Sequence, residues 1–596
     1  MSSTLPARRQ FLCGAVTSLS ALVLNQAAPR WAYSQGLTAN TPVHTGPFTL
    51  RVAKHNFQFG SKQQSSITLN GQMPGPLLRF TEGQTAIIDV VNQLKEDTSV
   101  HWHGIILPSD MDGVPGLSFS GIKPNSTFRY TFDLNQNGTY WYHSHSGLQE
   151  QSGHIGPLVI MPKNGDMGAD REHTILLSDW TFADPHDIYR HLKVSEGYYN
   201  YQKRTIFDTL QDIHTNGLAA TWQDRSMWNS MRMDPRDIAD VTGSVYTYLM
   251  NGKDSLMNYE ALFKPGEKVR LRLINGSAMT YFDFRIPGLS LTVVAADGQP
   301  VKPVTVDEIR IAIAETYDIV VQPKSHKAYT LFAESYDRSG FVRGTLTPQP
   351  GLTAAVPARR KMVERGMNAM SMDHEMTGHH TMNMAGSSSS EPMSATAGHQ
   401  HMAHRSPQPA EIPVNTIPIH HSPKEHGAGA AMIAHDPKPR MDEPGLGLEN
   451  NGRRVLVYQD LIGATPWPDN RPPHRHIELH LTGNMQRYMW SFDGIKFSEV
   501  TGPIHFEYGE RLRLILVNDT MMDHPIHLHG MWMELENGQS PRPRKHTVSL
   551  KPAEKLSLLV TADAKGKWAF HCHLLYHMKA GMFRVVNVQD GGNSHD

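Results

Sequence analysis

The sequence has almost no cysteine, no excess of charge and no long apolar run after residue 40. Of its two cysteines, Cys13 lies in a segment that we expect to be removed, so Cys572 alone excludes a disulfide framework. Lys plus Arg number 56 and Asp plus Glu 57, which leaves no field to steer a polyanion and excludes nucleic acid as an expected partner. No later segment is apolar for long enough to anchor the chain in a membrane.

Histidine and methionine are abundant instead, at 34 and 30 residues. Imidazole and thioether are ligands that copper selects, so the composition indicates coordination of a soft or borderline metal. The 596 residues exceed one small stapled module, and at roughly 100–200 residues per domain they predict three to five domains.

The N-terminus has the pattern of an export signal. Arg8 and Arg9 precede an apolar stretch from about Phe11 to Leu24, and Ala32-Tyr-Ser34 offers a small-x-small cleavage site. The pattern resembles the twin-arginine type, so we expect residues 1–34 to be recognised by the twin-arginine export machinery. The mature chain is then expected to be soluble in the periplasm.

One pattern occurs three times along the chain. In each copy an Asn-Gly or Asp-Gly pair leads to a Phe, a Gly three residues later and an Asn nine residues after that Gly. Apolar and polar residues alternate between the Gly and the Asn, as in a strand with one buried face. The pattern predicts three copies of one β-domain, over residues 41–165, 170–350 and 446–592.

The first and third copies carry histidine pairs that the second lacks. The four His-x-His pairs stand at equivalent offsets in the two copies, whereas the second copy has Phe284 and no histidine there. A lone pair is a weak signal, but four aligned pairs indicate converging imidazoles. We therefore expect the metal in copies one and three, with copy two as a spacer.

Residues 351–445 interrupt the strand pattern and are rich in Ala, Gly, Ser, Pro, His and Met. Residues 362–435 contain ten His and ten Met, against about four His expected from an even spread. We expect a disordered linker before the third domain. It is either a biased segment without a defined site or an accessory copper site formed by Met367, Met370, Met372, His374, Met376, His379, His380, Met382, Met384, His399, His401, Met402 and His404.

The string from His571 to Met582 predicts two metal sites that share one strand. Successive strand side chains point to opposite faces, so His571 and His573 face one way and Cys572 the other. His577 and Met582 follow Cys572, and His524 precedes the third histidine pair. Two imidazoles, a thiolate and a weak axial thioether form a blue-copper electron-transfer site. Zinc would leave the thioether unexplained and bring no redox function.

With these motifs the chain resembles the multicopper oxidases, and most of all their periplasmic copper-resistance protein A group. The motifs are His-Trp-His-Gly, His-Ser-His, His-Pro-Ile-His-Leu-His-Gly and His-Cys-His-Leu-Leu-Tyr-His with Gly-Met. The resemblance implies an all-β fold of three cupredoxin-like Greek-key β-sandwich domains, with a Met/His-rich insertion between domains 2 and 3. It implies four copper ions: type 1 at His524, Cys572, His577 and Met582; type 2 at His101 and His527; and a type 3 pair at His103, His143, His145, His529, His571 and His573.

The resemblance also implies a mechanism. A reducing substrate gives single electrons to the type 1 copper, Cys572 and its flanking histidines carry them to the trinuclear cluster, and four electrons reduce O2 to two waters. Asp112 matches an acidic residue that relatives place near the type 2 site, which suggests a proton role, although Asp-Gly is also a common turn. Tyr576 stands where relatives carry Glu, so another acid or a water chain has to supply protons.

The methionines favour Cu(I) as the substrate, oxidised for copper resistance, since soft sulfur binds Cu(I). For the smaller cluster of Met227, Met231 and Met233 we expect core packing. A laccase-like oxidase of phenols or aromatic amines is a second interpretation, because the same copper core supports it. Copper sequestration by the 362–435 segment is a third. We expect a monomer.

Overall fold

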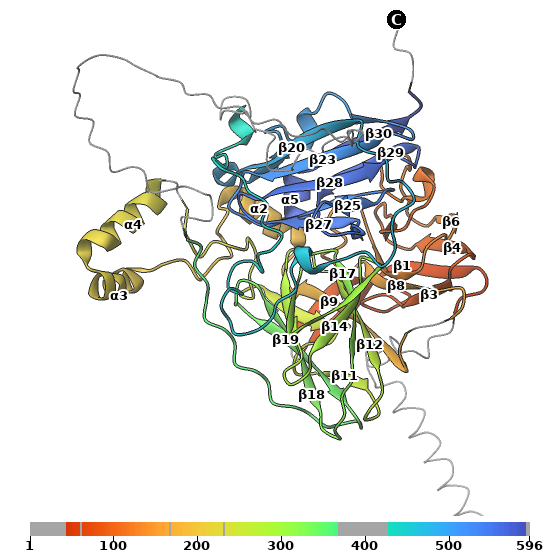
Figure 1. Ribbon diagram of the computed structural model, residues 1–596, viewed down its shortest axis with the longest axis horizontal. Coiled ribbons are helices and arrows are strands. Elements are labelled where there is room, and N and C mark those ends of the chain that lie inside the picture. Colours follow the sequence, from red (N-terminus) through yellow and green to blue (C-terminus); the bar gives the residue numbers. More distant parts are fainter. Residues whose placement is uncertain (1–42, 60–61, 166–167, 231–232, 367–426, 592–596) are drawn as a thin grey trace, which may run out of the picture.

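The computed structural model describes residues 43–59, 62–165, 168–230, 233–366 and 427–591. It consists of three β-sandwiches, each made of two sheets, which confirms the predicted all-β cupredoxin-like fold. The third sandwich lies above the second in Figure 1, and the first lies beside both. The predicted export signal lies outside the described residues. Among the described residues, no helix has the length and apolarity needed to cross a membrane.

The first sandwich carries two four-stranded sheets, in the orders β2-β1-β4-β6 and β3-β8-β7-β5. Two of the predicted histidine pairs lie in its second sheet, one on β5 and one at the end of β7. The strands are β1 (Phe48–Phe59), β2 (Lys62–Leu69), β3 (Leu78–Thr81), β4 (Thr85–Asn92), β5 (His101–His103), β6 (Thr127–Asp133), β7 (Gly138–His143) and β8 (Ile155–Met161).

The second sandwich has sheets of six and five strands, in the orders β10-β9-β12-β17-β14-β15 and β11-β19-β18-β13-β16. Its strands are β9 (Arg171–Thr181), β10 (Tyr246–Met250), β11 (Tyr259–Leu262), β12 (Val269–Asn275), β13 (Phe282–Arg285), β14 (Leu291–Ala296), β15 (Gln299–Val306), β16 (Glu308–Ile311), β17 (Thr316–Val321), β18 (Tyr329–Ser335) and β19 (Phe341–Thr347).

The third sandwich repeats this plan, with the orders β21-β20-β23-β28-β25-β26 and β22-β30-β29-β24-β27. Strands β24 and β29, which carry the other two histidine pairs, are antiparallel neighbours with His527 opposite His571. The strands are β20 (Arg475–Asn484), β21 (Met489–Phe492), β22 (Ile504–Glu507), β23 (Arg511–Asn518), β24 (His524–Leu528), β25 (Met533–Leu535), β26 (Arg544–Lys545), β27 (Thr547–Leu550), β28 (Lys555–Thr561), β29 (Gly566–Cys572) and β30 (Phe583–Gln589).

The asparagine of the threefold sequence pattern has the same task in each sandwich. Asn92, Asn275 and Asn518 are fully buried, and the Nδ2 of each donates to one main-chain carbonyl of the loop that follows it and to one of a separate segment. A buried amide with both protons bonded is satisfied, so it fixes the loop that follows the strand. In the first and third sandwiches the chain then enters β5 and β24, which carry histidines.

Helices occupy a region where the all-β prediction has none. Between β9 and β10 the second sandwich inserts α2 (Pro185–Val194), α3 (Ile206–Asn216) and α4 (Leu218–Ser230), and α3 and α4 project from the body in Figure 1. Local signals for α3 exist, because Thr205 and Asp208 form a capping box. The remaining helix of the described residues is α5 (Leu575–Ala580). The short 3-10 turns are η2 (Ser109–Met111), η5 (Gly427–Gly429), η6 (Tyr458–Asp460), η7 (Met485–Arg487) and η8 (Phe497–Glu499).

Both ends of the 351–445 segment pack against the folded chain. Arg365 is buried and donates its main-chain N–H to Pro235, and the N–H of Ala434 donates to Asp519. The prediction of a disordered linker over 351–445 is therefore wrong for the two ends of that segment. The intervening residues 367–426, with all the predicted accessory ligands, lie outside the described residues.

Buried ion pairs join the sandwiches. Arg79 of the first sandwich pairs with Glu172 of the second, and Thr139 of the first donates to Asp318 of the second. Between the second and third sandwiches, the fully buried Lys545 lies 3.1 Å from both Asp297 and Glu315. Removing one partner of such a group leaves an uncompensated buried charge, so the three sandwiches are held in one arrangement.

Candidate metal centre

Eight histidines converge where the first sandwich meets the third. They come from β5, from β7 and the loop after it, from β24 and the residue after it, and from β29 and the residue after it. All are buried except His145, which is partly exposed. We call this set the histidine cluster: His101, His103, His143, His145, His527, His529, His571 and His573.

Several overlapping groups of three histidines lie close enough to share a metal ion, and two of these groups together contain six of the eight residues. In each of the triads His103–His143–His573 and His145–His529–His571, one ring nitrogen per residue lies within 4.8 Å of the others. The triads share no member, which leaves His101 and His527. The rings of His103 and His527 stack at 3.9 Å between centroids, so the pair and the triads are parts of one compact site.

Main-chain and side-chain oxygens fix which nitrogen faces the centre. Nδ1 of His527 lies 2.6 Å from the carbonyl of His546, and Nδ1 of His101 lies 2.8 Å from that of Asp112. Nδ1 of His529 lies 2.8 Å from the Asp112 carboxylate. An outward Nδ1–H fixes the tautomer and leaves the Nε2 lone pair free to bind a metal.

The electrostatics of the cluster fit a bound cation. Burial, reinforced by neighbouring imidazoles, lowers the pKa of six of the eight histidines well below the usual range and that of His571 to about 4, so these seven rings are neutral. Several buried nitrogens have no hydrogen-bond partner within the described residues, at a cost of about 1–3 kcal/mol each. These are the Nε2 atoms of His101, His103, His143, His145, His527 and His573.

A second site lies on the other face of β29, as the alternation of strand side chains predicts. Sγ of Cys572 lies 3.5 Å from Nδ1 of His524 and 4.0 Å from Nδ1 of His577, and the two nitrogens are 3.3 Å apart. Met582 is fully buried, and its carbonyl accepts the main-chain N–H of Cys572. We call Cys572, His524, His577 and Met582 the cysteine site.

The cysteine site is closed to water and suited to copper. Burial raises the pKa of the Cys572 thiol and lowers those of His524 and His577 well below the usual range. A thiol in such surroundings ionises only when a cation takes its place beside it. Thiolate with imidazole is a donor set that copper prefers, so the residues fit a copper ion.

Comparison with known proteins assigns the family. Three family models, each described as multicopper oxidase, match residues 51–165, 171–356 and 470–592. Copper resistance protein A of Escherichia coli is 49% identical over 98% of this chain and 99% of its own length. The chain belongs to the multicopper oxidase family. It is therefore a copper-containing oxidoreductase, related to the copper-resistance proteins.

Other members of the family share the sequence or the fold. Multicopper oxidase MmcO of Mycobacterium tuberculosis is 30% identical over 96% of this chain and 95% of its own length. The crystal structure of Fet3p, described as a multicopper oxidase that functions in iron import, superposes with a TM-score of 0.62 at 18% identity and covers 91% of this chain and 90% of that one. The likeness to Fet3p shows that the two proteins share a fold.

In this multicopper oxidase the Asp112 carboxylate contacts two histidines of the cluster. Oδ2 contacts Nδ1 of His529, and Oδ1 lies 3.2 Å from Nδ1 of His101. It thus joins a histidine of the first sandwich to one of the third. Gly113 follows with φ +77°, and a Cβ there would overlap the carbonyl of Val100, so the Asp-Gly turn is also required by packing.

A buried acid that the sequence interpretation missed is Glu150. Its Oε2 lies 2.8 Å from Nδ1 of His143, and burial raises its pKa well above the usual range. Tyr576 by contrast is fully buried and stacks on Tyr189. The first sandwich therefore brings a carboxyl group to the histidine cluster although position 576 has none. The sequence signal was weak, since Glu150 stands in a loop outside every motif.

Two further residues near the ligands were missed. Oδ2 of Asp240, from the second sandwich, lies 2.7 Å from Nε2 of His577, and burial raises the Asp240 pKa to about 7. His546 packs edge-on to His103 at 4.8 Å between ring centroids, and its Nε2 is buried without a partner in the described part of the chain. The second sandwich, expected to be only a spacer, thus contacts the cysteine site.

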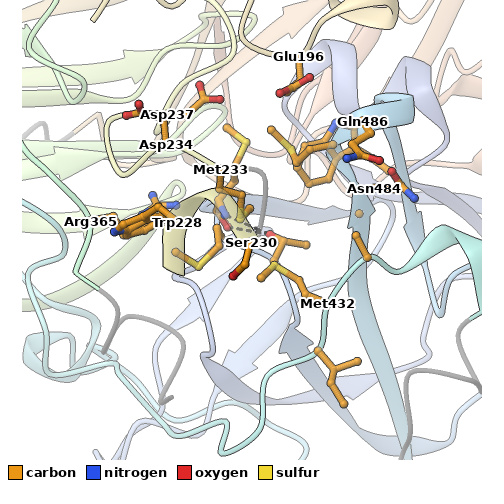
Figure 2. A pocket seen from close by; sticks show the side chains of 18 of the residues that line it. Glu196, Trp228, Ser230, Met233, Asp234, Asp237, Arg365, Met432, Asn484 and Gln486 are labelled. Carbon is orange, nitrogen blue, oxygen red and sulfur yellow. Dashed lines mark hydrogen bonds between the residues drawn. The ribbon is translucent and has the colours of Figure 1, made fainter. Parts of the chain in front are cut away.

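A cavity of about 530 Å³ adjoins the cysteine site. Its wall includes Trp490 and Thr520, which contact the cysteine-site histidines, and five methionines: Met233, Met432, Met485, Met521 and Met522. We call it the methionine pocket. Figure 2 shows Met233 and Met432 on different segments of its wall, with Glu196, Asp234 and Asp237 along one side. Met233 packs against the buried cluster of Trp228, Ala434, Met521 and Ala553, as expected, and also lines this pocket, while Met231 lies outside the described residues.

Proposed function

We propose that this multicopper oxidase holds four coppers and couples oxidation of Cu(I) to reduction of O2 to water. The cysteine site would hold the type 1 copper. His101 and His527 would hold the type 2 copper, and the two triads would each hold one type 3 copper. Bound copper supplies reversible one-electron transfer. The chain itself has to position the electron donor, the route of the electron between the two sites, and O2.

The chain provides a covalent path between the two sites. Cys572 belongs to the cysteine site, and its sequence neighbours His571 and His573 belong to different triads. An electron that enters beside Cys572 therefore reaches either triad through a short run of bonds. Asp112 and Glu150 hold imidazoles of the cluster from outside, and Asp112 is the residue for which we propose a proton role.

The methionine pocket is the observation that favours Cu(I) as the substrate. Thioethers are soft ligands suited to Cu(I), and five of them line a space whose wall touches the cysteine site. Glu196, Asp234 and Asp237 add negative charge that attracts a cation. Relatives named copper resistance proteins support the same substrate class.

Two alternatives lead to different outcomes. A laccase-like oxidase would accept a phenol in the same pocket, whose volume is sufficient for one ring. A sequestering protein would bind copper in the 362–435 segment and depend little on the pocket. For localisation we propose the periplasm, reached through a twin-arginine signal, with the protein acting as a monomer.

Oxygen uptake with Cu(I) or a phenol as donor tests the proposal. Met522→Leu and Met432→Leu keep the apolar volume but remove the thioether, so we expect a raised KM for Cu(I) and unchanged phenol oxidation. Met250→Leu, fully buried in the second sandwich, is the matched control. Equal loss with both donors would contradict the substrate assignment. Deleting residues 367–426 distinguishes sequestration from oxidation, because sequestration predicts fewer coppers per chain and unchanged turnover.

A further inference from the structure

The histidines of the cysteine site have no surface that a donor can touch. His524 and His577 are both fully buried, and neither lines the methionine pocket. Their outer nitrogens are occupied, that of His524 by the Thr520 hydroxyl at 2.7 Å and that of His577 by Asp240 at 2.7 Å. A donor in the pocket must therefore pass its electron through a residue of the pocket wall.

Trp490 is the wall residue in widest contact with both histidines. Its indole stacks on the His577 ring at 3.9 Å between centroids and 19° between planes, and lies 5.2 Å from the His524 ring. The same side chain lines the methionine pocket. One aromatic system thus lies between the donor space and both imidazoles.

The position of this indole is fixed by its surroundings. Trp490 is fully buried on β21, and a Cβ on Gly483 of the neighbouring strand β20 would overlap its ring. Its Nε1 has no hydrogen-bond partner among the described residues, so packing alone holds the ring. A tightly packed aromatic ring is a stable contact surface for the imidazole that it covers.

We propose that Trp490 is the electron-entry contact of this enzyme. An electron lost by a donor in the methionine pocket passes by way of the indole and the stacked His577 ring to the cysteine site. For a Cu(I) donor, one Cu(II) forms for each electron accepted there, the indole is left unchanged, and no proton or ligand is transferred. The choice of Cu(I) as donor rests on the proposed function, whereas the route through Trp490 is the same for any donor in the pocket.

Other routes around Trp490 are less direct. Asp240 and Tyr488 contact His577 but do not line the pocket. Thr520 lines the pocket and contacts His524, but through one hydrogen bond of a saturated side chain. A Thr520→Val variant removes that hydrogen bond and measures the share of this second route.

Anaerobic stopped-flow reduction tests the proposal in the full, copper-loaded chain. Bleaching of the blue absorbance is followed after mixing with Cu(I) as its acetonitrile complex, and separately with a phenol. We expect Trp490→Leu to slow reduction by both donors by about an order of magnitude, and Trp490→Phe, which keeps an aromatic ring, to slow it less. Trp180→Leu is the matched control, because Trp180 is a buried tryptophan of the second sandwich outside the pocket wall, and should reduce at the wild-type rate.

Spectra separate electron entry from damage to the site. The blue absorbance, the reduction potential of the cysteine site and the rate of reoxidation by O2 should be unchanged in Trp490→Phe. This variant replaces Trp490→Leu as the test if Trp490→Leu does not bind copper. Wild-type reduction rates in both variants, or a large loss in Thr520→Val alone, would overturn the proposal. If the wild type fails to oxidise Cu(I), the proposed function is wrong, while the phenol traces still decide the role of Trp490.

Discussion

Nε2 of His577 lies 2.7 Å from Oδ2 of Asp240, and this contact joins two different sandwiches. Asp240 belongs to the second sandwich, which provides no member of either candidate metal site. The same Oδ2 accepts the hydroxyl of Tyr488 at 2.6 Å. The carboxylate thereby fixes the His577 tautomer with Nδ1 toward Cys572, and the second sandwich becomes part of the cysteine site.

Removing this carboxylate should loosen the cysteine site. In Asp240→Ala, His577 loses the acceptor that orients its ring, so we expect copper affinity at this site to fall about 10–100-fold. Blue absorbance titrated against a copper chelator measures this. Asp234→Ala is the control, since Asp234 lines the pocket without a contact to either histidine. Unchanged affinity in Asp240→Ala would show that packing alone orients His577.

Replacing the thiol should separate the two sites. Cys572→Ser keeps the size of the side chain but removes the soft donor, so blue absorbance and turnover with any donor should be lost. The histidine cluster contains no atom of that side chain, and we expect its copper to remain. Copper per chain and electron paramagnetic resonance measure both effects; retained blue absorbance or turnover would refute the assignment.

Glu150 should matter for the cluster and not for the cysteine site. Glu150→Gln replaces the carboxyl group that lies 2.8 Å from Nδ1 of His143 with an amide, so copper in the His103–His143–His573 triad should bind about 10–100-fold more weakly. We expect the near-ultraviolet band of the coupled copper pair to weaken while blue absorbance stays constant. A normal band and a full copper count would contradict this role.

His480 should make stability depend on pH in the alkaline range. Burial opposes its charge, but hydrogen bonds to Asp519 and Glu478 outweigh burial and raise its pKa to about 9. Because the folded pKa lies above the unfolded value of about 6.5, the stabilisation is complete below pH 6.5 and is lost as pH rises through 9.

Thermal or urea unfolding at several pH values measures the effect. We expect wild type to lose on the order of 1–3 kcal/mol between pH 6.5 and 10 from this group. His480→Gln should be less stable at neutral pH and lack that part of the decline. Parallel profiles of the two proteins would exclude the imidazolium as the cause.

The residues of both candidate sites could be named from the sequence because their signal is local. Alternation along β29 separates Cys572 from His571 and His573 whatever the rest of the chain does. The matching histidine pairs made the first and third sandwiches the carriers of the cluster. Helices α3 and α4 were missed, since the all-β interpretation rested on the threefold pattern, which the insertion between β9 and β10 does not share.

The sequence by itself thus determined the fold class, the family and the residue types of both sites. Only the tertiary structure decided which histidines lie together in groups of three, that Glu150 contacts His143 and Asp240 contacts His577, and that methionines from four segments line one pocket beside Trp490. The physical reason is range: strand alternation is fixed by neighbouring residues, whereas these contacts join positions far apart in the chain and exist only once the sandwiches pack.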